Sequence, residues 1–217
     1  MRLLELFCGT KSIGDVFQKN GYEVVSLDYD RQFNATHTVD ILDWDYTIYP
    51  VGHFDCIWGS PDCSTFSIAS HGKYRTVAQP YGKGDENQDK ADIGNKCVDK
   101  LIEIIEYFQP DSWFIENPRG LMKHYPPLKA YTEPHNFTEV FYGNYEWDYP
   151  KPTHIWSNKL LWEKEKLPVM PESSYRLWKD KTGRTKRYYL TYSNRKGKKR
   201  SAIPPLLVER LYGLTES

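Results

Sequence analysis

The chain has 217 residues, of which 39% are hydrophobic and 15% aromatic, so it can bury the core of one domain. Its 29 basic and 29 acidic residues cancel, so the net charge by itself indicates no polyanionic partner. No apolar run reaches the roughly 18 residues of a membrane span, and no CxxC pair occurs among the four cysteines, which favours a soluble, reduced, intracellular protein without a structural zinc.

Strands and helices are predicted to alternate over the first 120 residues. Strands are expected at residues 3–7, 22–27, just before 40, 54–58 and 113–115, with helices over 12–20 and 93–108. This alternation predicts an α/β fold with a mostly parallel sheet and helices on both faces. Ligands of such sheets bind outside the carboxyl ends of the strands, where glycine and polar residues gather in this sequence.

The pattern changes after Pro118. Strand-like aromatic segments are expected around 138–145 and 153–156, and a helix is expected to open at Ile203. Between them, residues 159–200 hold 14 basic and 4 acidic residues. A solvated loop would explain such a block, but the tyrosines and the tryptophan interleaved with its cations favour contact with a nucleic acid. We therefore predict a catalytic domain of residues 1–158 and 201–217, with 159–200 as a short basic insertion.

Residues 7–14, FCGTKSIG, form a turn from strand to helix in which two glycines allow a ligand close to the backbone. The turn lacks the GxGxxG fingerprint, so by itself it indicates a nucleotide site only weakly. Asp28, at the end of the next strand, could accept hydrogen bonds from ribose hydroxyls, and Asp40 with Ile41 could contact an adenine. Ordinary turn aspartates are the alternative.

The segment GSPDCSTFS at 59–67 follows a predicted strand and places Cys63 in a loop rich in glycine, proline, serine and threonine. A lone cysteine is more often a small buried hydrophobe, but in such a loop its side chain can reach a substrate. Glu116 and Asn117 close the neighbouring strand. A cysteine and a glutamate at adjacent strand ends can converge on one planar substrate.

Together these segments resemble, in order along the chain, the motifs of DNA (cytosine-5)-methyltransferases, and more closely their compact phage and prophage members. FCGTKSIG is similar to the cofactor loop, GSPDCSTFS to the catalytic loop GxPPCQxFS, and the ENP at 116–118 to the ENV motif. KPTHIWSN at 151–158 resembles KPTDIWTN, and RSAIPP at 200–205 resembles the last motif. The resemblance implies a Rossmann-like fold that uses S-adenosyl-L-methionine to methylate carbon 5 of cytosine in DNA.

The resemblance also implies roles for individual residues. Cys63 would add to carbon 6 of a flipped cytosine, Glu116 would hold ring nitrogen 3 and the exocyclic amine, and Asn117 would position that carboxyl group. The implied cofactor contacts are Phe7, Cys8, Gly9, Thr10, Lys11, Ser12, Ile13, Gly14, Asp28, Tyr29, Asp40, Ile41, Ser60 and Pro61. The implied DNA contacts are Ser64, Lys151, His154, Arg176, Lys179, Lys181, Arg184, Lys186, Arg187, Tyr188 and Arg195. No metal, membrane or obligate protein partner is expected, and a cytoplasmic monomer in a bacterium or phage-infected host fits the pattern.

Several positions depart from the family pattern. Asp62 replaces the second proline of the catalytic loop, Ser64 replaces a glutamine and Lys11 replaces a glycine. The arginine pair of the QxRxR motif is absent, and Lys151 or His154 could stand in for it. A weak or inactive DNA-binding relative, the same chemistry on RNA or a modified cytosine, and a nicotinamide-dependent oxidoreductase are the alternatives. So short an insertion predicts low sequence specificity or a target of about two to four base pairs.

Overall fold

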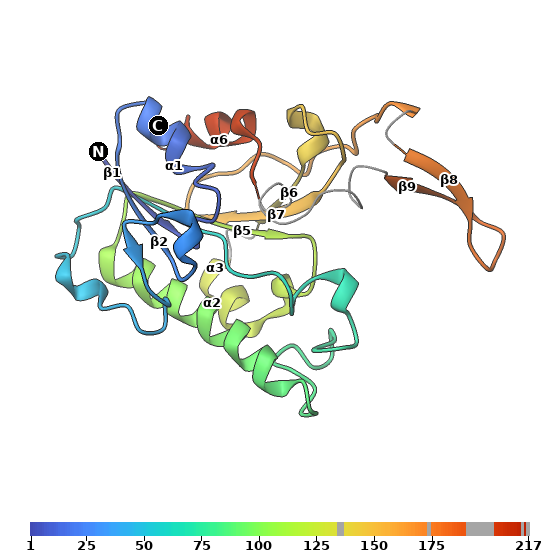
Figure 1. Cartoon of the computed structure of the whole chain (residues 1–217), viewed down its shortest axis with the longest axis horizontal. Helices are drawn as coiled ribbons and strands as arrows, with labels where there is room; N and C mark the ends of the chain where they lie inside the picture. The colour runs from blue at the N-terminus through green and yellow to red at the C-terminus, as the bar shows by residue number, and fades with distance from the viewer. Residues whose placement is uncertain (134–136, 173–174, 190–201, 214, 216–217) are drawn as a thin grey trace.

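The computed structural model describes residues 1–133, 137–172, 175–189, 202–213 and 215. Seven strands form one sheet in the order β3-β2-β1-β4-β5-β7-β6 (Figure 1). The strands from β3 to β5 are parallel, whereas β7 runs antiparallel to both of its neighbours. The bounds are β1 Arg2–Leu6, β2 Glu23–Asp28, β3 His37–Thr38, β4 Cys56–Gly59, β5 Ser112–Pro118, β6 Phe137–Phe141 and β7 Pro152–Ser157. The predicted α/β fold with a mostly parallel sheet is confirmed.

Helices cover both faces of this sheet (Figure 1). Helices α1 (Gly14–Lys19) and α6 (Pro205–Tyr212) lie together on one face, and α2 (Gln88–Phe108) and α3 (Pro126–Thr132) cover the other. Single 3-10 turns occur in the connections: η1 Arg31–Phe33, η2 Tyr46–Ile48, η3 Ile68–Ser70, η4 Met122–His124 and η5 Tyr142–Tyr145. The helix predicted over 12–20 is shorter than expected, because turns occupy the chain up to residue 13.

Strand β1 shows why the central strands read as apolar runs in the sequence. Leu3 packs in the cluster beneath α1 and α6, whereas Leu4 packs in the cluster beneath α2. Both faces of the strand are buried, so nearly every residue in it must be apolar. Glu5 is the exception: it lies on the α1 face, beside Gly14.

A separate hairpin projects from the body of the molecule (Figure 1). Its strands β8 (Tyr175–Lys179) and β9 (Thr185–Tyr189) pair antiparallel. The Asp180 carboxylate closes the turn by accepting backbone N–H bonds from Thr182 at 2.9 Å and Arg184 at 3.1 Å. The turn predicted between two strands over 179–185 is thus present.

The beginning of the predicted insertion, however, packs against the body of the protein. The Glu165 carboxylate accepts hydrogen bonds from the backbone N–H of Phe141 at 3.0 Å and from the Asn144 side chain at 2.9 Å. Met170 is buried, with its sulfur beside Gly143. Only the hairpin, and not the whole of 159–189, therefore stands away from the domain.

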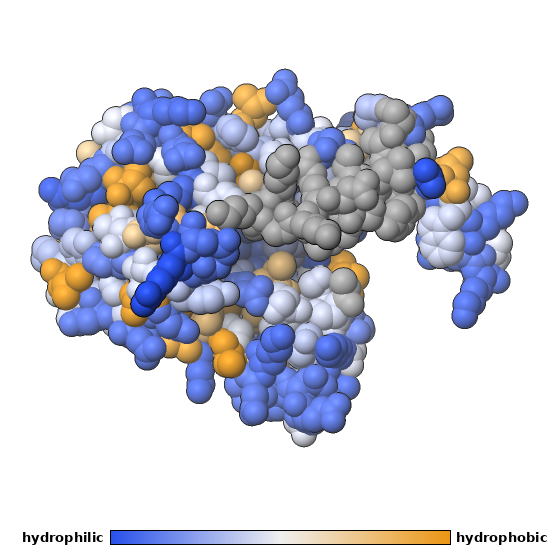
Figure 2. Space-filling model, in the orientation of Figure 1, coloured by the Kyte–Doolittle hydropathy of each residue, from blue (hydrophilic) through white to orange (hydrophobic). Residues whose placement is uncertain are grey.

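Hydrophilic side chains prevail on the face of the molecule shown in Figure 2, and apolar residues form small separate patches there. Within the described residues, the chain forms no helix with the length and apolar character that a membrane span requires.

Gly59, the last residue of β4, sets the distance between the sheet and α2. A Cβ atom at this position would lie 2.5 Å from Leu101 Cδ1. We therefore expect Gly59→Ala to lower the free energy of unfolding by about 1–3 kcal/mol, because extra volume in a filled core forces strain. Urea denaturation monitored by circular dichroism measures this change.

Gly213 provides the matched control, because it has a helical φ of −56° and a Cβ there would meet no atom within 3.4 Å. Gly213→Ala should leave stability unchanged or slightly higher. In a Leu101→Ala background, Gly59→Ala should lower the free energy of unfolding by a smaller amount, because the clashing side chain is gone. An equal cost in both backgrounds would contradict the steric explanation.

Candidate active site

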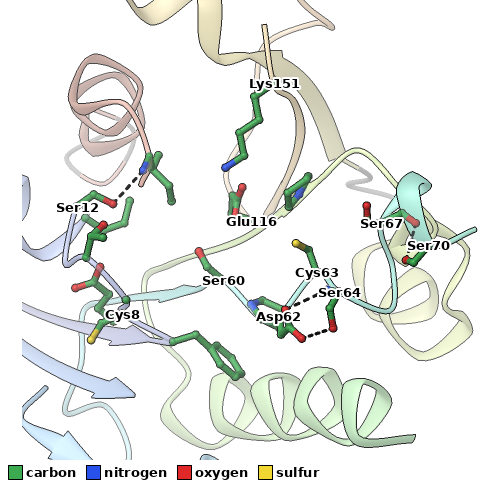
Figure 3. A pocket seen from close by; sticks show the side chains of 18 of the residues that line it. Cys8, Ser12, Ser60, Asp62, Cys63, Ser64, Ser67, Ser70, Glu116 and Lys151 are labelled. Atoms are coloured by element: carbon green, nitrogen blue, oxygen red, sulfur yellow. Dashed lines mark hydrogen bonds between the residues drawn. The ribbon is translucent and has the colours of Figure 1, made fainter. Parts of the chain in front are cut away.

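A cavity of about 620 Å³ opens at the carboxyl ends of β1, β4 and β5 (Figure 3). Its position agrees with the general rule for parallel sheets. Its walls come from six parts of the chain: Glu5, Phe7, Cys8, Gly9, Thr10, Ser12 and Ile13; Ser60, Pro61, Asp62, Cys63 and Ser64; Ser67, Ser70, Lys73 and Tyr74; Glu116 and Pro118; Tyr149 and Lys151; and Ile203.

The turn after β1 forms one end of the cavity. Phe7 and Gly9 both have positive φ, 59° and 47°, so the backbone reverses sharply as it leaves the strand. The Lys11 N–H closes the turn on the Cys8 carbonyl at 2.8 Å. The Ile203 N–H donates to Ser12 Oγ at 3.1 Å, so the chain segment before α6 forms a second wall against the turn (Figure 3).

Glu5 is a cavity residue that the sequence analysis missed. Its side chain is 2% exposed, and it accepts a backbone hydrogen bond from Gly14 at 3.2 Å. Burial raises the pKa of the Glu5 carboxyl to about 8, although backbone N–H groups oppose this rise. The signal was present in the sequence, because Glu5 is the single charged residue in the apolar run 3–7 that was predicted as the first strand.

Other predicted cofactor contacts lie outside the cavity wall. Both carboxylate oxygens of Asp28 accept backbone N–H bonds, from Gly9 and from Asp30, each at 2.9 Å, so Asp28 holds the turn after β1 in place. The Lys11 ammonium donates to the Asn34 carbonyl, which directs it away from the cavity. Tyr29 is 75% exposed, beyond the end of β2.

Two further predicted contacts lie next to each other. The Asp40 side chain is exposed and accepts the Leu42 N–H at 3.0 Å, as an ordinary turn aspartate does. Ile41 is 3% exposed and belongs to the core cluster beneath α2. Gly14 lies outside the cavity wall but next to Glu5, which belongs to that wall. A Cβ at Gly14 would lie 2.7 Å from the Glu5 carboxylate.

Cys63 lies in a tight turn directly after β4. Its carbonyl accepts the N–H groups of Phe66 at 3.0 Å and Ser67 at 2.8 Å. Asp62 stabilises the start of this turn, because its carboxylate accepts from the Ser64 N–H at 3.1 Å and the Ser64 hydroxyl at 2.5 Å. In Figure 3 the Asp62 carboxylate points toward Ser64, whereas the Cys63 sulfur points toward Glu116 and the cavity.

Two cysteines line the cavity, and their surroundings distinguish them. Burial raises the pKa of the Cys8 thiol to about 12. Burial raises the pKa of the Cys63 thiol to about 11; the carboxyl groups of Asp62 and Glu116 add to this rise, and the Lys151 ammonium opposes it. A lysine ammonium opposes the rise at each thiol, Lys11 at Cys8 and Lys151 at Cys63, but of these two lysines only Lys151 lines the cavity.

Glu116 lies at the end of β5 with its side chain 5% exposed. The Tyr142 hydroxyl donates to Glu116 Oε1 at 2.9 Å. Burial raises the pKa of the Glu116 carboxyl, whereas the Lys151 ammonium and hydrogen bonds from Tyr142 and Ser60 lower it. Lys151 extends over the Tyr142 ring, with its ammonium 4.4 Å from the ring centroid, and enters the cavity above Cys63 (Figure 3).

Asn117 acts on the catalytic loop and not on the neighbouring glutamate. Its side chain is fully buried, and its Nδ2 donates to the Pro61 carbonyl at 2.9 Å. This bond ties the end of β5 to the residues that precede Cys63. Asn117 was predicted to position the Glu116 carboxyl. Among the hydrogen bonds of the described residues, its side chain bonds to Pro61 and not to that carboxyl.

His154 does not lie where a DNA contact requires it. Its ring is 1% exposed, its Nε2 is 3.3 Å from Glu139 Oε2, and it packs 4.3 Å from the Phe137 ring centroid. Burial lowers the pKa of His154 to about 4. The two proposed replacements for the missing arginines thus differ, because Lys151 precedes β7 and enters the cavity whereas His154 lies within β7 and faces the core.

A buried arginine holds the catalytic loop from below. Arg75 is 0% exposed, and its guanidinium lies 3.7 Å from the centroid of the Phe66 ring. Its N–H groups donate at 2.8–3.1 Å to the carbonyl oxygens of Thr65, Pro80 and Ala91 and to the side-chain oxygens of Thr65 and Asn95. All five acceptors are neutral oxygens, and together with the face of the Phe66 ring and the nearby Asp92 carboxylate they compensate in part for removing this cation from water.

The predicted DNA contacts of the basic insertion lie on the hairpin. Arg176, Lys179, Lys181, Arg184 and Lys186 are exposed there, although Lys186 forms a 3.0 Å ion pair with Asp180. For Arg187 and Tyr188 the structure describes only the backbone position within β9, and Arg195 lies outside the described residues. Ser64 belongs to the cavity wall.

Comparison with known proteins agrees with this architecture. The sequence pattern of the C-5 cytosine-specific DNA methylases matches residues 1–149. A protein of Frog virus 3 (isolate Goorha), named "Probable DNA (cytosine-5)-methyltransferase", is 31% identical over 233 residues that cover 99% of this chain and 100% of the viral protein.

Two solved structures share the fold. One is a protein assigned as a DNA modification methyltransferase and encoded within a prophage of E. coli, with a TM-score of 0.51, 14% identity, and 72% of this chain and 46% of that chain covered. The other is the S. pombe Dnmt2 methyltransferase, with a TM-score of 0.51, 13% identity, and 76% and 53% covered. This chain spans about half the length of these two proteins. The fold is therefore the Rossmann-like methyltransferase fold that the sequence predicted.

Arg75→Met tests whether the buried arginine stabilises the loop that carries Cys63. The substitution removes five donated hydrogen bonds and leaves buried acceptors without a partner, so we expect the free energy of unfolding to fall by about 2–4 kcal/mol. Urea denaturation measures the change. Arg2→Met is the matched control, because the Arg2 ion pair with Glu23 is 46% and 70% exposed and should contribute little. Equal stability of the two variants would rule out the anchoring role.

Proposed function

The chain belongs to the C-5 cytosine-specific DNA methylase family, and we propose that it methylates cytosine in DNA with Cys63 as the nucleophile and Glu116 as the carboxyl partner. The observation that supports this assignment is the convergence of Cys63, Glu116 and Lys151 on one cavity at the strand ends (Figure 3). The three residues come from different parts of the sequence. A nucleophile, a proton carrier and a cation are the groups that addition to a pyrimidine ring requires.

S-adenosyl-L-methionine is the cofactor of this family, and when bound it supplies the methyl group. The residues of this chain fit that group. Glu5 presents to the cavity a buried carboxyl whose charged form lacks compensation, and an amino-acid ammonium is the kind of cation that would supply it. The turn from Phe7 to Ile13 brings backbone atoms to the same end of the cavity, and Ser60 and Pro61 would bound it toward the target base.

Cys63 must lose its proton before its sulfur adds to carbon 6 of the target cytosine. The Lys151 ammonium favours the thiolate, whereas the Asp62 and Glu116 carboxylates oppose it. A proton on Glu116 removes one of these two opposing charges. The raised pKa of Glu116 therefore assists Cys63 as well as the target base, because a neutral Glu116 carboxyl does not oppose the thiolate.

Glu116 would bind the ring atoms opposite the bond that Cys63 forms. Its buried, protonated carboxyl can donate to ring nitrogen 3 while the sulfur adds, and carbon 5 then carries the electron density that accepts the methyl group. Transfer of the carbon-5 proton to a water molecule, expulsion of the Cys63 thiolate and return of the nitrogen-3 proton to the Glu116 carboxylate would restore both residues. A cytosine within a duplex must be flipped out of the stack to reach this cavity, at a cost of a few kcal/mol.

The insertion would bind the DNA around the target. A two-stranded ribbon such as β8–β9 fits the major groove, and its exposed lysines and arginines suit phosphate contacts. The catalytic domain of residues 1–158 and 201–217 would then hold the flipped base and the cofactor. The segment that packs against β6 and η5 would link the two parts.

Cys63→Ala should lower methyl transfer to cytosine-containing DNA by about a thousandfold or more, because it removes the attacking sulfur. Incorporation of labelled methyl groups into DNA measures this loss. Cys97→Ala, which changes a cysteine on α2 outside the cavity wall, should retain activity. The native protein should form a covalent adduct with DNA containing 5-fluorocytosine, and Cys63→Ala should not.

The alternative of an inactive DNA-binding relative receives support from one observation, the raised pKa of Cys63. It predicts DNA binding by the native protein with neither methyl transfer nor a covalent adduct. That result would end the assignment of Cys63 as a nucleophile.

The hairpin makes a separate prediction about salt. Each phosphate contact releases counterions, so Lys181→Gln with Arg184→Gln should weaken DNA binding and reduce the slope of log affinity against log salt by about two. Fluorescence anisotropy at several salt concentrations measures the slope. Lys129→Gln, on α3, removes an exposed charge far along the chain from the hairpin and should leave the slope unchanged. A slope that is the same in all three proteins would show that the hairpin does not contact DNA.

A further inference from the structure

Tyr142 lies behind the cavity and touches Glu116, one of the two buried acids in its wall. It follows β6 directly, in η5, and its side chain is 0% exposed. Its hydroxyl donates to Glu116 Oε1 at 2.9 Å. Glu116 lines the cavity, whereas Tyr142 stands outside the cavity wall. One oxygen of the Glu116 carboxyl is thus engaged by the protein interior, which leaves Oε2 for the cavity.

The sheet register explains why these two residues meet. Phe141 pairs with Pro152 at the last position of the β6–β7 ladder, so Tyr142 comes opposite Lys151 immediately after it. The Tyr142 N–H donates to the Lys151 carbonyl at 3.4 Å, and the Lys151 ammonium lies 4.4 Å from the Tyr142 ring centroid. β7 also pairs with β5, which carries Glu116. The phenol, the ammonium and the carboxyl are therefore fixed relative to one another by backbone pairing.

The hydrogen bond between Tyr142 and Glu116 has a defined direction. Burial and the nearby Glu116 carboxyl raise the pKa of Tyr142 well above its ordinary value, so the phenol keeps its proton and donates. A protonated carboxyl has one carbonyl oxygen and one hydroxyl oxygen, and the carbonyl oxygen is the better acceptor. Since Oε1 accepts from Tyr142, a proton carried by Glu116 resides on Oε2.

Building on the proposed role of Glu116, we propose that Tyr142 is a positioning residue that keeps the proton of Glu116 on Oε2, directed at the target base. Without the phenol, the carboxyl can turn and carry its proton on either oxygen. Only one of these arrangements presents the proton to ring nitrogen 3. Tyr142 would thus act on the reaction through Glu116 without touching the substrate.

Besides the Thr153 side chain, which hydrogen-bonds to Tyr142 and lowers its pKa, four other groups face Glu116 or its partner and enter the same titration. The Lys151 ammonium and the Ser60 hydroxyl favour the ionised carboxyl, and a Cys63 thiolate would disfavour it. Tyr149, in the turn before β7, raises the pKa of Tyr142. Removing the Tyr142 hydroxyl leaves all four in place. Because that hydroxyl stabilises the carboxylate, its loss raises the pKa of Glu116.

Tyr142→Phe is the decisive variant, because it keeps the ring beneath Lys151 and removes only the donor. We expect kcat for methyl transfer to fall by about 10- to 100-fold, with KM for DNA near the native value. We also expect the alkaline limb of the pH–rate profile to move to higher pH. A carbon-13 NMR titration of the Glu116 carboxyl in the free protein, assigned with Glu116→Gln, should move in the same direction.

Tyr125→Phe is the matched control. Tyr125 is also buried, and its hydroxyl donates to the Asp99 carboxylate at 2.8 Å and 2.9 Å outside the cavity wall. This variant loses a comparable buried hydrogen bond, so any change in its kcat measures the effect of a structural defect alone. It should leave kcat, the alkaline limb and the Glu116 titration at their native values.

The outcomes separate this inference from the proposed function. If the native protein forms no adduct with 5-fluorocytosine DNA, the proposed function fails, and the Glu116 titration still decides whether Tyr142 governs the carboxyl. If the adduct forms and Tyr142→Phe leaves the titration unmoved, the positioning role is overturned, even where kcat falls. A raised Glu116 pKa together with a lower kcat supports it.

Discussion

The burial of the Glu116 carboxyl at the end of β5 is the constraint around which the site is arranged. A carboxylate removed from water is unstable unless it is hydrogen-bonded or paired, and here Tyr142 and Lys151 supply those partners from the antiparallel end of the sheet. Their compensation is incomplete, since the pKa of Glu116 stays above its ordinary value. Incomplete compensation favours the protonated form of this carboxyl. The same charge balance reaches Cys63, whose ionisation Glu116 opposes and Lys151 assists.

A reactive cysteine on a loop needs a rigid support, and the structure provides it from two sides. Asn117 ties the strand that bears Glu116 to the Pro61 carbonyl just before Cys63. Arg75 binds the loop just after it, through the carbonyl and the hydroxyl of Thr65. Both supports are buried polar groups whose hydrogen bonds would be costly to leave unmade. The distance between nucleophile and acid therefore depends on hydrogen bonds that do not themselves touch the cavity.

The parts of the site that could be read from the sequence are those that follow directly from strand ends. Cys63 lies in the loop after one predicted strand and Glu116 closes the next, and parallel strands bring their carboxyl ends to one edge, so their convergence was predictable. The direction of the Asn117 side chain toward the Pro61 carbonyl and the burial of His154 could not be predicted, because side-chain direction within a paired strand depends on the register. Tyr142 gave no signal of its own in a segment with many aromatic residues.

The sequence by itself determined the alternation of strands and helices, the order of the motifs and the position of the Cys63 loop after a strand, because these depend on local periodicity and on residues adjacent along the chain. Only the tertiary structure decided which polar side chains are compensated and which face the cavity. Glu5 and Asp28 illustrate the difference: both end up buried near the turn after β1, yet backbone N–H groups bind both oxygens of Asp28 while Glu5 faces the cavity with a raised pKa. Burial and hydrogen-bond partners are properties of the folded chain, and they arise from contacts between residues far apart in the sequence.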